Sequence, residues 1–151
     1  MDEALVVYDE DGTELIEEAG ELAAGVDASV TVLALMTEAE FDEARDALDV
    51  VAAEEGTGYD DSVALDAARQ EAREAVAELY DGLGLDWNVV GSVIEDDSAA
   101  ASQIVEVAED HGVDHVFITG KRRSPTGKAV FGDRAQAVIL NFDGPVTTLV
   151  D

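Results

Sequence analysis

One short stretch of the chain, residues 120–134, concentrates the side chains that could bind a ligand. Five of the eight Lys and Arg residues in the sequence lie in it: Lys121, Arg122, Arg123, Lys128 and Arg134. Its one acidic residue is Asp133, although the chain carries 36 Asp and Glu and a formal net charge of −28. Backbone N–H groups can approach a ligand closely at its glycines, Gly120, Gly127 and Gly132. This combination predicts a site for an anion, and we expect a phosphate-bearing small molecule.

An alternative for the same stretch is an ion-pairing surface for the acidic remainder of the chain or for a neighbouring subunit. The glycines favour the phosphate site, because a surface ion pair needs no close approach of the backbone. The stretch is not a P-loop. Position 122, five residues before Gly127, is Arg122, and Ala129 replaces the Ser or Thr that follows the P-loop lysine.

Length and composition indicate one domain, residues 1–151, with an aliphatic core. Apolar residues make up 47% of the chain and aromatic residues 5%. Without cysteine the chain has no disulfide, thiol nucleophile or thiolate metal site. No apolar run approaches the roughly 20 residues of a membrane span, and the N-terminus does not resemble a signal peptide. We therefore expect a cytoplasmic protein that binds no membrane.

The acidic charge has two interpretations, disorder and adaptation to high salt. Apolar content and clear periodicities argue against disorder. A carboxylate-rich surface with only two lysines suits a halophilic protein, because molar salt screens self-repulsion within about 3 Å. The same charge argues against nucleic-acid binding, which needs a basic surface.

The elements that must position the cationic stretch follow from hydrophobic periodicity. A continuous apolar run, typical of a strand buried on both faces, occurs at 4–8, and further strands are predicted at 29–36, 87–94, 115–119 and 145–150. Helical periodicity lies between them, at 13–25, within 37–60, and at 62–83, 96–110 and 132–141. For the first of these helices, the pattern predicts Thr13 as the N-cap and an inward stripe that includes Leu22.

Alternation of strands and helices predicts an α/β fold, a three-layer open five-stranded parallel sheet with helices on both faces (Rossmann-like). Ligands of such sheets bind beyond the carboxyl ends of the strands, at the topological switch point. Asp9, Met36 and Gly120 all lie at predicted carboxyl ends. Asp9 could accept hydrogen bonds from a ribose or a base, or it could be only a turn residue.

The chain resembles the universal stress protein family over nearly its whole length. The resemblance rests on the first strand ending at Asp9, on His-Gly-Val-Asp at 111–114, on the glycine loop from Gly120, and on Gly-Pro-Val-Thr-Thr-Leu-Val at 144–150. It implies an adenine nucleotide alpha hydrolase-like fold and a homodimer formed through the last strand, residues 145–150. Many members bind ATP and others do not.

ATP-binding members of that family resemble the pattern Gly-x2-Gly-x9-Gly-Ser/Thr. Here Gly120 and Gly132 match, Arg123 stands at the second glycine, the spacing is one residue short, and Asp133 stands at the hydroxyl position. An aspartate at this position repels phosphate, whereas the surrounding cations attract it. By this resemblance, Asp9 and Leu35 would contact the base and sugar of a ligand such as ATP or AMP. The phosphates would then contact Gly120, Lys121, Arg122, Arg123, Gly127, Lys128, Gly132 and Asp133.

Two functions of different class remain at this stage. The first is a stress-response protein that binds a nucleotide or another phosphorylated anion without efficient turnover. The second is a regulator that acts as a dimer or a protein-interaction module without binding ATP. An enzyme is disfavoured, because the pattern offers no nucleophile, no metal ligands and no catalytic histidine; His111 and His115 are interpreted as structural.

Overall fold

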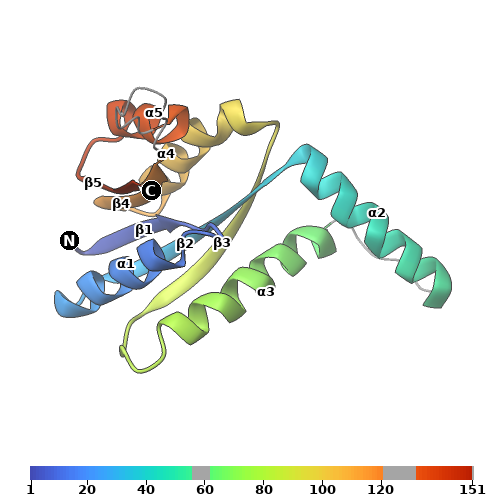
Figure 1. Cartoon of the computed structure of the whole chain (residues 1–151), viewed down its shortest axis with the longest axis horizontal. Helices are drawn as coiled ribbons and strands as arrows, with labels where there is room; N and C mark the ends of the chain where they lie inside the picture. The colour runs from blue at the N-terminus through green and yellow to red at the C-terminus, as the bar shows by residue number, and fades with distance from the viewer. Residues whose placement is uncertain (56–61, 121–131, 151) are drawn as a thin grey trace.

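A computed structural model describes residues 1–55, 62–120 and 132–150 (Figure 1). Its strands are β1 (Glu3–Val7), β2 (Ser29–Thr37), β3 (Trp87–Ile94), β4 (His115–Gly120) and β5 (Val146–Val150). Its helices are α1 (Thr13–Gly25), α2 (Glu38–Glu55), α3 (Ser62–Leu79), the 3-10 turn η1 (Asp97–Ala99), α4 (Ala100–Asp110) and α5 (Asp133–Asn141). No helix in the described part of the chain is long and apolar enough to cross a membrane.

The strands form one parallel sheet in the order β3-β2-β1-β4-β5. The central strand β1 has β2 on one side, where Val6 is level with Val32, and β4 on the other, where Val6 is level with Phe117. The predicted three-layer α/β fold is thereby confirmed. The helix predicted within residues 37–60 is α2, which extends outward from the end of β2 (Figure 1).

Each face of the sheet has its own core, because successive side chains of a strand point to opposite faces. Ala4 and Val6 of β1 lie in one cluster with α1 and α3, whereas Leu5 and Val7 lie in the other with α4 and α5. Figure 1 shows the two helix pairs on opposite faces of the sheet. This two-sided burial explains why β1 is a continuous apolar run from Ala4 to Val7 in the sequence.

The start of α1 differs from the prediction that Thr13 is its N-cap. The N-cap position is Gly12, which makes no side-chain capping bond, and Thr13 is the exposed first residue of the helix. The loop before α1 is stabilised instead by Asp9. Its side chain accepts a hydrogen bond from the N–H of Asp11, and its carbonyl accepts one from the N–H of Gly12. A turn organised around Asp9 therefore replaces the predicted cap.

The buried stripe of α1 also differs from the prediction, because Leu22 is 45% exposed and Gly20 is buried. The ring of Tyr80, which follows α3, lies over Gly20: a Cβ built on Gly20 would be 2.3 Å from Cε1 of Tyr80. The Tyr80 hydroxyl donates a hydrogen bond of 2.9 Å to the carbonyl of Ile16, and its ring packs edge-on against Trp87. Gly20 thus lets α1 and the end of α3 approach closely.

We predict that Gly20→Ala destabilises the fold by about 1–2 kcal/mol. Alanine favours a helix by up to about 1 kcal/mol over glycine, but overpacking a core costs about 1–3 kcal/mol. Chemical denaturation would measure the free energy of unfolding. Gly25→Ala is the matched control, since nothing lies within 4 Å of a Cβ at Gly25. A Gly20→Ala variant as stable as the wild type would contradict the packing described.

Candidate functional site

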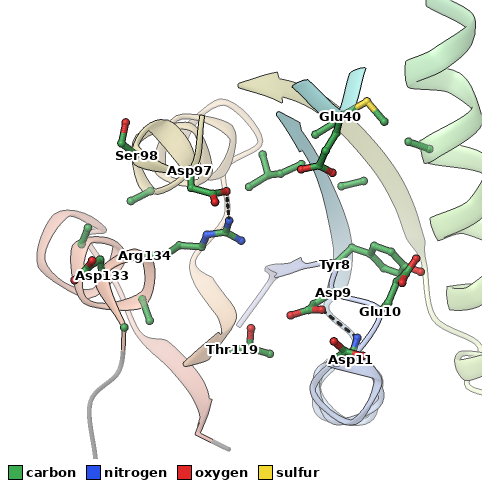
Figure 2. Close-up of a pocket in the computed structure, with 18 of the residues that line it drawn as sticks. Tyr8, Asp9, Glu10, Asp11, Glu40, Asp97, Ser98, Thr119, Asp133 and Arg134 are labelled. Carbon is green, nitrogen blue, oxygen red and sulfur yellow. Dashed lines mark hydrogen bonds and ion pairs between the residues drawn. The ribbon is translucent and has the colours of Figure 1, made fainter. Parts of the chain in front are cut away.

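A cleft of about 1030 Å³ opens at the carboxyl end of the sheet. Its floor is formed by the loop after β1, from Tyr8 to Asp11, together with the end of β2 and Thr119 of β4. One wall comes from α2 and α3, through Glu40 and Glu71 among others. The other wall comes from η1, α4 and the start of α5 (Figure 2). The cleft therefore spans both helix layers.

The position of the cleft follows from the strand order. β1 and β4 are neighbours, but the chain continues from β1 to α1 on one face and from β4 toward α5 on the other. The two connections diverge, and this divergence is the topological switch point at which open α/β sheets bind ligands. Gly12 lets the loop after β1 approach β4 closely: a Cβ built there would be 2.9 Å from Cγ2 of Thr119.

Asp9 is a turn residue, as one of the two interpretations of the sequence predicts, and its contact with a ribose or a base stays a prediction. Its Oδ1 accepts the N–H of Asp11 at 3.0 Å, and its carbonyl accepts the N–H of Gly12 at 2.9 Å. These bonds make it a turn residue. It also lines the cleft, and Figure 2 shows its carboxylate beside Thr119. The turn bonds fix the orientation of a carboxylate that faces the cleft.

The structure brings together some of the other predicted site residues. Leu35, Gly132 and Asp133 line the cleft, as Asp9 does. Gly120 does not line it; it is buried at the end of β4, level with Val150 of β5. The remaining predictions, for Lys121, Arg122, Arg123, Gly127 and Lys128, lie outside the described residues.

Sequence reasoning missed two side chains of the cleft that form an ion pair. Arg134, in the first turn of α5, lies 3.3 Å (Nη2 to Oδ1) from Asp97 of η1. Figure 2 shows the guanidinium reaching from α5 into the cleft toward Asp97. Arg134 belongs to the cationic stretch, so its charge could have identified it as a site residue from the sequence. Its ion pair with Asp97, 37 positions away in the sequence, could not have been predicted from the sequence.

The described part of the cleft is strongly acidic. Arg134 is the one cation among the lining residues of this part. The carboxylates among them are Asp9, Glu10, Asp11, Glu40, Glu71, Asp97 and Asp133. Burial, followed by the charges of Glu71, Glu10 and Asp9, raises the pKa of Tyr8, so its phenol stays protonated and available as a hydrogen-bond donor.

Both histidines have structural surroundings. Nδ1 of His111 lies 2.9 Å from the carbonyl of Val107 at the end of α4, and His115 stacks on Phe117 at the start of β4. Burial is the main cause that lowers the pKa of His115, so its neutral form is favoured. His115 lies at the amino end of its strand, opposite the cleft. Within residues 1–55, 62–120 and 132–150, no group of three acidic or histidine side chains is arranged to hold a metal ion.

Comparison with solved structures shows the same fold over almost the full length of each chain. A universal stress protein from Archaeoglobus fulgidus is 23% identical, with 98% of both chains covered and a TM-score of 0.61. The universal stress protein UspA from Lactobacillus plantarum is 19% identical, with coverage of 98% of this chain and 97% of that one and a TM-score of 0.66. A structure of a universal stress protein from Archaeoglobus fulgidus in complex with dAMP is 16% identical, with coverage of 98% of this chain and 97% of that one and a TM-score of 0.61.

Comparison by sequence gives the family directly. No curated protein matches the chain. The model of the universal stress protein family matches residues 1–149, which is nearly the complete sequence. This match agrees with the strand order, with the position of the cleft and with the resemblance noted in the motifs. The chain therefore belongs to the universal stress protein family.

Proposed function

We propose that this protein binds a nucleotide, or another phosphorylated anion, in the cleft at the switch point and does not turn it over efficiently. The observation that carries the proposal is the cleft of about 1030 Å³ between β1 and β4, large enough for a small-molecule ligand. The cations Lys121, Arg122, Arg123 and Lys128 follow β4 in the sequence, and Thr119 of β4 lines the cleft. A family relative in complex with dAMP supports a ligand of the AMP class.

Roles within the cleft follow from the chemistry of its residues. Leu35 offers an apolar surface to a base, and Asp9 offers a carboxylate that can accept hydrogen bonds from an amino group or a ribose hydroxyl. The phosphates would contact the backbone at Gly132 and the side chains and glycines of the cationic stretch: Gly120, Lys121, Arg122, Arg123, Gly127 and Lys128. ATP and AMP are the ligands to test first.

Slow or no turnover is proposed because the described lining of the cleft contains no histidine and no Ser-His or Cys-His pair. Its titratable groups are carboxylates, Arg134 and Tyr8, a phenol that stays protonated. A stress-response role then depends on ligand occupancy and not on a chemical step. We place the protein in the cytoplasm of a salt-adapted cell, on the basis of its charge and composition.

A second candidate is a regulator that acts through its dimer without a ligand. The acidity of the described cleft favours it, because the seven carboxylates among the described lining residues repel an anionic ligand. Both candidate functions assume a homodimer formed through the edge strand β5, which we propose from the family resemblance. The two differ in whether a nucleotide stabilises the protein, and this can be measured directly.

Nucleotide binding is tested by thermal unfolding in molar KCl with AMP, ADP, ATP or sulfate. A ligand at about 100 times its Kd stabilises by about 2.7 kcal/mol, which raises the Tm of a chain of this size by about 5–10 °C. We expect this rise with a nucleotide and a smaller one with sulfate. An unchanged Tm with all nucleotides would favour the ligand-free regulator, and an equal rise with sulfate would reduce the site to a general anion site.

Asp133→Ser should strengthen phosphate binding about three- to tenfold, because it removes a negative charge from the phosphate side of the cleft. The same change should cost up to about 1 kcal/mol of stability, since Asp133 is the first residue of α5 and its charge favours the helix dipole. Calorimetric titration with AMP and denaturation of the free protein would separate the two effects. Asp143→Ser, the same substitution after α5, is the control and should leave affinity unchanged. Weaker binding by Asp133→Ser would contradict the proposed arrangement.

The dimer is tested at Thr148. The N–H of Val116 donates to the carbonyl of Pro145, and the alternation of a parallel ladder then turns the N–H of Thr148 away from β4, toward the open edge of β5. Thr148→Pro should therefore block pairing between edges and leave the internal sheet intact. Light scattering is expected to give twice the chain mass of 15.9 kDa for the wild type and the single mass for the variant. A monomeric wild type would exclude the dimer.

A further inference from the structure

The ion pair between Arg134 and Asp97 is placed where a ligand would have to contact it. Both side chains line the cleft, and they approach each other from α5 and η1, which lie on the same wall. In Figure 2 the guanidinium of Arg134 lies between Asp97 and the floor formed by Asp9 and Thr119. Among the described residues that line the cleft, Arg134 is the one positive charge. An anionic group on this side of the cleft therefore meets Arg134.

Asp97 is not needed to hold the turn that carries it. The capping carboxylate of η1 belongs to Asp96, which accepts the N–H and the hydroxyl of Ser98. These hydrogen bonds lower the pKa of Asp96 and keep it charged. The side chain of Asp97 is 84% exposed, and its one hydrogen bond in the described part of the chain is to Arg134. The carboxylate can therefore leave Arg134 without disrupting the backbone.

Arg134 has the chemistry to exchange this partner for a phosphate. A guanidinium presents several N–H donors in one plane, which match the oxygens of a carboxylate and of a phosphate equally well. An exposed ion pair such as the one with Asp97 is weak, so a phosphate that offers more than one oxygen and more charge can displace the carboxylate. The carboxylate occupies the donors that a phosphate would otherwise use.

We propose that Arg134 binds the phosphate of the ligand and that Asp97 is a built-in competitor that weakens this binding. This inference rests on the proposed function, because it adds Arg134 to the phosphate contacts proposed above, as a residue that helps to distinguish a phosphorylated ligand from its neutral nucleoside. The neutral nucleoside gains nothing from Arg134. Asp97 lowers the affinity for the phosphorylated form. The two residues therefore both affect the concentration of phosphorylated ligand that is needed to occupy the cleft.

The experiment compares AMP with adenosine by calorimetric titration in molar KCl. Arg134→Gln should weaken AMP binding about 10- to 100-fold, the range of a hydrogen-bonded charge, and should change adenosine binding less than about twofold. Asp97→Asn should strengthen AMP binding about two- to fivefold and leave adenosine unchanged. In the Arg134→Gln background, Asp97→Asn should give a smaller gain, because there is no guanidinium left to release.

Arg45→Gln is the matched control. Arg45 forms an ion pair of similar length with Asp42, 3.2 Å, and has a similar exposed fraction, 39% against 40% for Arg134, but it does not line the cleft. It should leave both affinities unchanged. If the wild type binds AMP and Arg134→Gln binds it equally well, or loses AMP and adenosine alike, the assignment of Arg134 is wrong while nucleotide binding stands. If the wild type binds none of AMP, ADP, ATP and sulfate, the assignment and the proposed function both fail.

Discussion

The reversal of strand order at β1 is the constraint on which the rest of the structure depends. The first half of the chain adds β2 and β3 on one side of β1, and the second half adds β4 and β5 on the other. Right-handed crossovers then send α1 and α3 to one face and α4 and α5 to the other. Because the loops after β1 and β4 leave toward opposite faces, an opening between them is unavoidable.

Small residues keep this opening well defined. Gly12 brings the loop after β1 against Thr119, and Gly20 lets Tyr80 and the end of α3 pack on α1. A side chain at Gly12 would clash with Thr119 of β4 at the floor of the cleft, and a side chain at Gly20 would push α1 away from Tyr80 at the end of α3. Both close approaches therefore require glycine.

Much of the fold was predictable from the sequence, because burial on both faces produces continuous apolar runs that periodicity detects. One error came from a contact between distant residues, and the other from a local turn. Leu22 fits the helical stripe of α1, but Tyr80, which lies outside α1 in the sequence, packs over Gly20. Thr13 is a residue type that often caps a helix, but Asp9 organises the preceding turn by accepting two backbone N–H groups. The local pattern of α1 does not contain Tyr80, and the residue type of Thr13 does not reveal the competing turn.

The position of the cleft was predictable because it lies at the carboxyl ends of the strands, and Asp9, Leu35, Gly132 and Asp133 all line it. Their contact with a ligand stays a prediction. The acidity of the cleft was not predictable, since carboxylates are frequent throughout the chain and only the fold selects those that face inward. Arg134 matters for the same reason. On a chain with so many carboxylates, a cation in the cleft forms an ion pair with one of them in the absence of a ligand. Because this ion pair must break before the cation binds phosphate, its strength lowers the affinity for phosphate. The position of Asp97 relative to Arg134 determines how strongly that competition acts.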